Sequence, residues 1–80
     1  MQLLTEIKDA NMLGQVIQQG RLELGLSQRQ LASQLGISQK WVWEMEQGKP
    51  GILMTRLFEM LESTGITLYA KIEITDWGHT

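Results

Sequence analysis

"SQRQLASQLGISQKWVWEMEQG", residues 27–48, is the stretch that decides the fold. Ser27 stands at the start of a capping box, which predicts a short helix, and Gly36 ends that helix. Ser38 can cap a second short helix, which Gly48 ends. Because only three residues separate the two helices, they must cross at a steep angle. The stretch therefore predicts a helix-turn-helix corner.

The second helix of this corner carries two tryptophans that cannot share one core. Side chains at positions i and i+2 point to different sides of a helix. With Val42 and Met45 taken as the inward face, we expect Trp41 to lie against the body of the domain and Trp43 to face outward. An outward tryptophan predicts contact with another molecule, either a nucleic acid or a partner protein.

Segments on both sides of the corner complete a helical domain. Asp9 can cap a preceding helix from about Ala10 to Leu24, which carries apolar residues at helical spacing. After the corner, residues 49–65 are apolar on more than one face of a helix. This favours partial burial against a second subunit, with a fully buried core helix as the alternative. The fold class that we expect is all-α, a small bundle of four to five helices.

A strand follows the last helix. Residues 66–75 alternate apolar and polar side chains, and such a strand must pair, either with residues 2–7 or with its own copy in a second subunit. We expect a single domain over residues 1–80, with a helical core at 9–64, a dimerisation strand at 66–75 and a tail at 76–80.

Composition excludes several functions. The 80 residues include no cysteine and one histidine, His79, so we expect no disulfide, metal site, cofactor or cysteine chemistry. No apolar run approaches the roughly 20 residues that span a bilayer, so we expect a soluble cytoplasmic protein without a membrane partner. The net charge is −2, yet residues 20–50 are net positive. No cluster of catalytic residues can be assembled, so an enzyme is not expected.

Residues 21–49 resemble the lambda-repressor-like (Cro/XRE) helix-turn-helix family. The family pattern runs Arg, three residues, Gly-Leu-Ser/Thr-Gln, then Leu-Ala, Gly-Val/Ile-Ser and a final Glu-x-Gly, and "RLELGLSQRQLASQLGISQKWVWEMEQGK" follows it without a gap. Within the family, "DANMLGQVI" at residues 9–17, the pair Trp41-Val42 and the strand-like tail are most similar to HipB-type antitoxins.

The resemblance implies which residues read DNA bases. The implied positions are Gln39, Lys40, Trp43 and Glu44. Amide, ammonium and carboxylate groups can bond to adenine, guanine and cytosine edges respectively, and an indole can press on a thymine methyl. Family members often have a small residue at the position of Trp43, so the indole is a departure from the pattern.

Phosphate contacts are expected beside the base readers, where helix N-termini and cations can meet the DNA backbone. The candidates are Ser27, Gln28, Arg29, Ser38 and Lys49. For Arg29 an ordinary solvated charge is an equal alternative. The resemblance also implies that Arg21 and Glu46 meet as a bidentate ion pair, which we assign to structure.

The function implied is that of a DNA-binding transcriptional repressor. HipB-type antitoxins suggest a homodimer whose C-terminal strands pair across the two-fold axis and which binds an inverted repeat in its own promoter. They also suggest a kinase-like, HipA-like toxin as partner. The residues expected to form the dimer contact are Leu53, Leu57, Phe58, Ile66, Leu68 and Ile72. Two alternatives remain: a module that neutralises a toxin kinase without DNA, with Trp77 in its docking surface, and a stand-alone phage-type repressor.

Overall fold

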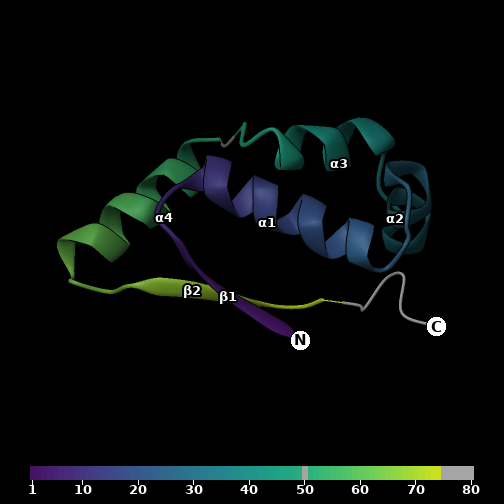
Figure 1. Cartoon of the computed structure of the whole chain (residues 1–80). Helices are drawn as coiled ribbons and strands as arrows, with labels where there is room; N and C mark the ends of the chain where they lie inside the picture. Colours follow the sequence, from purple (N-terminus) through teal and green to yellow (C-terminus); the bar gives the residue numbers. More distant parts are fainter. Residues whose placement is uncertain (50, 75–80) are drawn as a thin grey trace.

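Four helices and one two-stranded sheet form the fold, as described for residues 1–49 and 51–74 in the computed structural model (Figure 1). Along the chain the elements are β1 (Gln2–Ile7), α1 (Ala10–Glu23), α2 (Gln28–Leu35), α3 (Gln39–Glu46), α4 (Ile52–Ser63) and β2 (Leu68–Glu73). The prediction of a mostly helical bundle around a helix-turn-helix is confirmed. Trp77, His79 and the rest of the expected tail lie outside the described residues.

The helix starts lie where the capping residues predicted them. The Asp9 carboxylate accepts the Met12 backbone N–H at 2.8 Å at the start of α1. The Ser27 hydroxyl accepts the N–H of Gln30 at 3.0 Å, and the Gln30 side chain accepts the N–H of Ser27 at 2.8 Å, which completes the capping box of α2. These bonds connect residues three positions apart, so the helix starts are set locally.

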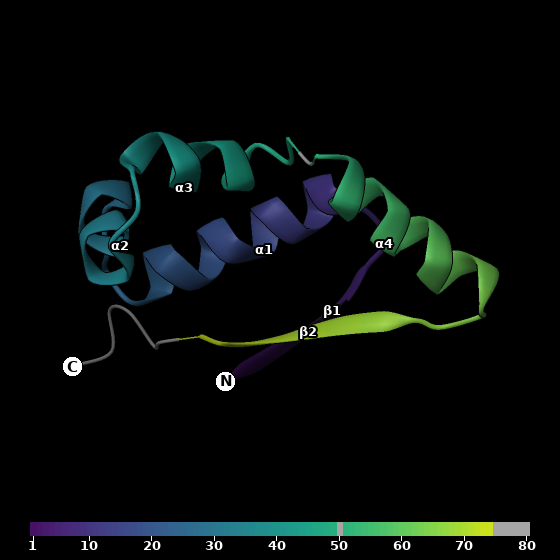
Figure 2. The same cartoon turned by 180° about the vertical axis from the view of Figure 1, so that it is seen from behind.

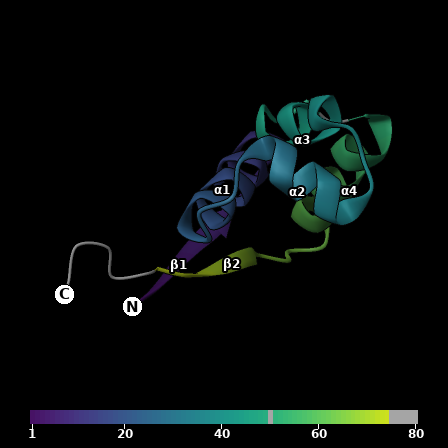
Figure 3. The ribbon, with the colours of Figure 1, turned by 90° about the vertical axis from the view of Figure 1, so that its right-hand side faces the viewer.

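The elements are arranged around α1. Figures 1 and 2 show α3 along one side of α1 and the sheet along the opposite side, with α2 and α4 near opposite ends of the molecule. Seen from the end, in Figure 3, α2 crosses in front of the other helices and the sheet lies below them. The outer side of α3 and the sheet therefore face opposite directions.

The sheet pairs β1 with β2 antiparallel within one chain, in a register that runs from Gln2 opposite Glu73 to Ile7 opposite Leu68. Pairing of this strand with its own copy in a second subunit stays a prediction, while the pairing with residues 2–7 within the chain is one of the two alternatives left open. Burial supports the pairing within the chain: Ile7 and Ile72 stand on the same face of the paired strands and are both buried. The strand is also shorter than expected, and Thr75 lies outside the described residues.

Glycines let α1 and α3 approach closely. A Cβ atom on Gly14 of α1 would stand 2.5 Å from the backbone oxygen of Met45 and 2.6 Å from that of Glu46. Gly48, just after α3, has φ +72°, and a Cβ atom there would stand 2.5 Å from the Cα atom of Asn11. At Gly14 the two helices therefore meet backbone to backbone, with no room for a side chain at that position.

The apolar core is small. Among the described residues the buried apolar side chains are Ile7, Ala32, Val42 and Ile72. None of the twelve residues of α4 is buried, and Leu53 is 83% exposed. Met54, Phe58 and Leu61 are half-buried, but the rest of the apolar surface of α4 has no cover within the described part of the chain.

The expected division of the tryptophans is wrong, because Trp41 is 55% exposed and Trp43 is 41% exposed. Val42 faces the core as expected, but Trp41 lines an apolar groove between α3 and α4 together with Leu53 and Leu57. Those leucines are themselves exposed, so nothing in the described chain closes over the indole. Both rings are consequently available to other molecules.

Candidate nucleic-acid interface

The corner between α2 and α3 is held by its turn. Gly36 takes up the left-handed conformation that a Cβ atom disfavours, with φ 69° and ψ 31°. The backbone N–H of Ile37 donates to the Ala32 oxygen at 3.0 Å. The Ser38 hydroxyl then accepts the N–H of Trp41 at 3.1 Å and starts α3. Two eight-residue helices thus meet at a fixed apex.

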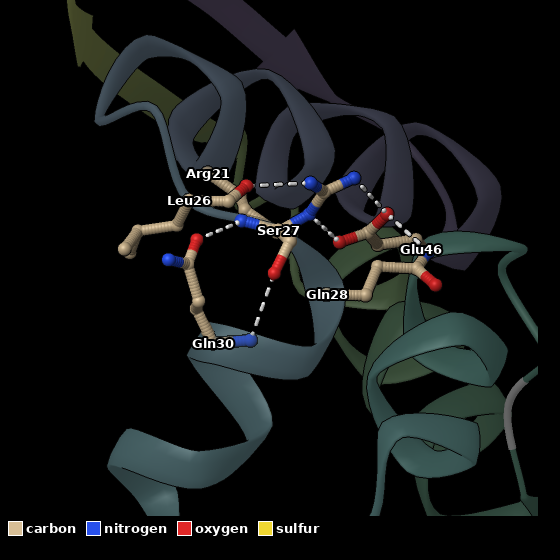
Figure 4. A network of polar contacts seen from close by, with 6 residues as sticks. All are labelled: Arg21, Leu26, Ser27, Gln28, Gln30 and Glu46. Carbon is tan, nitrogen blue, oxygen red and sulfur yellow. Dashed lines mark hydrogen bonds and ion pairs between the residues drawn. The ribbon is translucent and has the colours of Figure 1, made fainter.

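A buried ion pair holds the other end of this corner (Figure 4). Arg21 Nε donates to Glu46 Oε2 at 2.7 Å and Arg21 Nη2 donates to Glu46 Oε1 at 3.0 Å, the fork geometry that the resemblance implied. Arg21 Nη1 also donates to the backbone oxygen of Leu26 at 2.8 Å. Arg21 therefore joins α1 to the end of α3 and to the loop before α2.

The two charges in this pair stabilise each other. Hydrogen bonding from Arg21 lowers the pKa of Glu46 against the opposing effect of burial, and the hydrogen bond from Gln28 lowers it further. The bond to Glu46 raises the pKa of Arg21 above its ordinary value. Both side chains are almost fully buried, so the pair is ionised in a place where an unpaired charge would be very unfavourable.

The side chain of Gln28, which was expected to contact phosphate, points toward Glu46 inside the corner. Its Nε2 donates to Glu46 Oε1 at 3.1 Å, and the residue is half-buried beside Arg21 (Figure 4). No sequence pattern indicates this contact, because the two residues are 18 positions apart and the capping pattern defines only the N-terminus of a helix. The structure thus turns the side chain of Gln28 inward.

The remaining phosphate candidates lie at the two helix starts and just beyond α3. Ser27 and Ser38 use their hydroxyl oxygens as acceptors for helix N–H groups, so each hydroxyl hydrogen can still be donated to another molecule. The capping box occupies the N–H groups of Ser27 and Gln30. The N–H groups of Gln28 and Arg29, in the first turn of α2, have no acceptor within the helix. Arg29 is exposed on α2.

The outer side of α3 carries the candidate base readers. Gln39 is exposed, and the Lys40 side chain is 82% exposed. Lys40 Nζ lies 3.9 Å from Glu44 Oε1, one turn further along, in an exposed ion pair. Such exposed ion pairs contribute little to stability. The pair can therefore open, and each group can bind the edge of a base instead.

Trp43 and Lys49 form a stacked pair on this surface. Lys49 Nζ stands 4.9 Å from the centroid of the Trp43 ring, within the range of a cation–π contact. Lys49 comes from the segment after α3, so the contact positions a cation from outside the helix beside the indole. The structure therefore brings a candidate base reader and a candidate phosphate contact together.

The described ranges contain neither a cluster of metal ligands nor a membrane-spanning helix. Within residues 1–49 and 51–74, no group of three or more His, Cys, Asp or Glu side chains could hold a metal ion. Over these residues, no helix has the length and apolar character needed to cross a membrane.

The α2–α3 corner, its buried ion pair and the uncovered outer side of α3 define a helix-turn-helix protein, a class that binds DNA. The chain matches a family model described as a helix-turn-helix domain over residues 12–61, more than half of its length, and it belongs to that family, of the Cro/XRE-like kind. Comparisons with curated proteins and with solved structures gave no significant match.

Proposed function

We propose that this protein is a sequence-specific transcriptional repressor that reads DNA with the outer side of α3. The observation that carries the proposal is the combination of an exposed outer side, with Lys40 and Trp43 uncovered, and an inner end fixed by the buried Arg21–Glu46 pair. A rigidly held helix with polar and aromatic side chains on its free side suits the major groove of DNA. The role is binding rather than catalysis.

Base reading follows from the chemistry of four side chains on α3. Gln39 can bond to adenine and Lys40 to guanine, and Glu44 can accept a hydrogen bond from cytosine. Trp43 can press its ring against a thymine methyl while Lys49 keeps its contact with the indole. The exposed Lys40–Glu44 pair has to open for both groups to reach bases, which costs little.

Phosphates on either side of the groove would be bound by groups that flank α3. We assign this role to Ser27, Arg29, Ser38 and Lys49, with the outward backbone N–H groups at the start of α2. These contacts orient the protein on the duplex without selecting a sequence. The side chain of Gln28 is assigned a different role below.

A homodimer is the second part of the proposal. The uncovered apolar surface of α4 supports it, because a helix with no buried residue among its twelve leaves that surface in water in a single chain. Leu53, Leu57, Phe58, Ile66 and Leu68 remain candidates for the contact, whereas Ile72 is buried within its own chain. A two-fold dimer would place two α3 helices in successive major grooves about 34 Å apart and would read an inverted repeat.

The resemblance to HipB-type antitoxins supports a finer proposal. The protein would act in the cytoplasm as the antitoxin of a HipA-like operon, bind its own operator and bind a kinase-like toxin. The gene beside this one should then encode a kinase-fold protein that copurifies with this chain when the two are expressed together. A neighbouring phage or restriction gene, with no copurifying kinase, would favour a stand-alone repressor.

The test of DNA reading is a double substitution on α3. We expect Lys40→Ala with Trp43→Ala to abolish binding to a duplex selected by the wild-type protein from a random pool. The measurement is fluorescence anisotropy at two salt concentrations, because DNA binding through phosphates weakens as salt rises.

The matched control removes a lysine and an aromatic residue from the opposite side of the molecule. Tyr69 and Lys71 are both exposed on β2, so Tyr69→Ala with Lys71→Ala should leave duplex binding within about twofold of wild type. If both double variants bind equally well, or if the wild-type protein selects no duplex, the proposed function is wrong.

A further inference from the structure

The carboxylate of Glu46 is a junction of three helices. Arg21 reaches it from α1, and Gln28 Nε2 reaches its Oε1 from α2 at 3.1 Å (Figure 4). Gln28 is the first residue of α2 and Glu46 is the last residue of α3. The Gln28–Glu46 hydrogen bond therefore connects the two ends of the corner that lie furthest from its turn.

This bond completes a closed frame around the corner. At the apex, the backbone bond from Ile37 to Ala32 fixes the turn, and at the open ends Gln28 and Glu46 fix the separation of the helices. Arg21 already connects Leu26, just before α2, to Glu46, and Gln28 adds a direct bond from α2 itself that opposes a change in its angle to α3. DNA contacts depend on that angle, because the α2 N-terminus would bind phosphate while α3 reads bases.

A glutamine is chemically suited to this position. Its neutral amide donates to a carboxylate that already accepts two bonds from Arg21, so it adds a hydrogen bond without adding charge. A cation at residue 28 would compete with Arg21 for Glu46, and an anion would repel that carboxylate. The amide thus strengthens the frame while the buried pair stays electrically balanced.

We propose that Gln28 is a positioning residue, which sets the angle between α2 and α3 by holding Glu46. The proposal rests on the proposed DNA-reading function of α3. The expectation from the sequence, a direct contact of the Gln28 side chain with phosphate, is the alternative that the experiments below distinguish from it.

The test uses Gln28→Met, which keeps an unbranched side chain of similar length and removes the donor. Gln34→Met is the matched control, because Gln34 is exposed in the same helix. We expect Gln28→Met to lower affinity for the duplex that the wild-type protein selects by about tenfold, and to change affinity for an unrelated duplex by less than about twofold. Both affinities are measured well below the unfolding midpoint of each variant.

A second measurement needs no DNA. The pKa of the Glu46 carboxyl, followed by carbon NMR, should rise in Gln28→Met because a hydrogen bond to the ionised form has been removed. It should stay unchanged in Gln34→Met. This titration shows whether the Gln28–Glu46 bond exists in solution, independently of whether the protein selects a DNA sequence.

The outcomes separate the possible roles. Equal weakening on both duplexes with an unchanged Glu46 pKa would make Gln28 a phosphate contact and overturn the proposal. A raised pKa with unchanged affinities would make the bond purely structural and would also overturn it. A wild-type protein that selects no duplex removes the proposed function and the positioning role together, even if the titration still shows the bond.

Discussion

Arg21 and Glu46 show how one buried pair can hold several elements. The Glu46 side chain has no exposed surface, and the Arg21 side chain is 8% exposed. If one partner were removed, water could not solvate the buried charge that remained, so each charge depends on the other. Since the pair also fixes the loop before α2, the loss of one partner affects both stability and the surface of α3.

We expect Glu46→Ala to lower the free energy of unfolding by about 3–5 kcal/mol, because Arg21 would be left buried without a counter-charge. DNA binding should be lost together with stability. Glu59→Ala, which removes the exposed ion pair with Arg56, is the control and should cost less than about 1 kcal/mol. Urea unfolding measures both, and an unchanged stability of Glu46→Ala would contradict the assignment.

The same pair makes stability depend on pH. The pKa of Glu46 is lower in the folded protein than in the unfolded chain, so the contribution of the pair is complete above the ordinary pKa of about 4.3. It is lost as the pH falls from there through the folded-state pKa. Glu46→Gln should therefore show a shallower fall in the free energy of unfolding below about pH 4.3 than the wild-type protein.

At the scale of elements, the contact between α1 and α3 depends on Gly14. The position lies inside a helix, where glycine is less favourable than alanine, yet a Cβ atom there would meet two backbone oxygens. Backbone oxygens of a helix cannot move aside as a flexible side chain can. The residue is therefore required by the approach of the two helices and not by the helix to which it belongs.

We expect Gly14→Ala to destabilise the protein by about 3 kcal/mol, because α3 must shift away from α1 and the Arg21–Glu46 geometry must change with it. Gly20→Ala is the matched control, since Gly20 is in the same helix and a Cβ atom there meets nothing within 4 Å. Gly20→Ala should stabilise the protein by about 0.5–1 kcal/mol. Thermal unfolding of both variants gives the comparison, and a similar midpoint for the two would contradict this account.

At the scale of the whole molecule, the small core and the uncovered α4 have the same consequence. An 80-residue chain has little interior, and here part of its apolar surface is left on one helix. Burial of that surface in a second copy would stabilise both subunits. Stability should then depend on protein concentration.

Leu53→Ser with Leu57→Ser tests the dimer. Both leucines are exposed on α4, so the substitutions should leave the folded chain intact while converting a dimer into a monomer. We expect a monomeric sedimentation coefficient at micromolar concentration and at least about tenfold weaker binding to the selected duplex, because the two half-sites are no longer bound by linked subunits. Leu4→Ser with Leu24→Ser removes two exposed leucines elsewhere. If this control dissociates while the α4 variant stays dimeric, α4 is not the contact.

The sequence by itself determined the features that depend on near neighbours. Caps at Asp9, Ser27 and Ser38 act over three residues, and Gly36 provides the left-handed turn, so the helix starts and the corner were predictable. Periodicity also placed Val42 in the core and the strand after α4. Caps and turns depend on residues within a few positions of one another, so a single sequence is enough to predict them.

Only the tertiary structure decided the features that depend on distant residues. The pairing of β1 with β2, the inward turn of Gln28 and the close approach at Gly14 each join positions that lie far apart in the sequence. The greater exposure of Trp41 than of Trp43 depends on their neighbours, because Leu53 and Leu57 beside Trp41 are themselves exposed whereas Lys49 lies over the Trp43 ring. A helical wheel gives the direction of a side chain, but it does not contain the neighbour that buries it. Burial and the choice of partner are properties of the assembled elements. They depend on the position of α1 between α3 and the sheet.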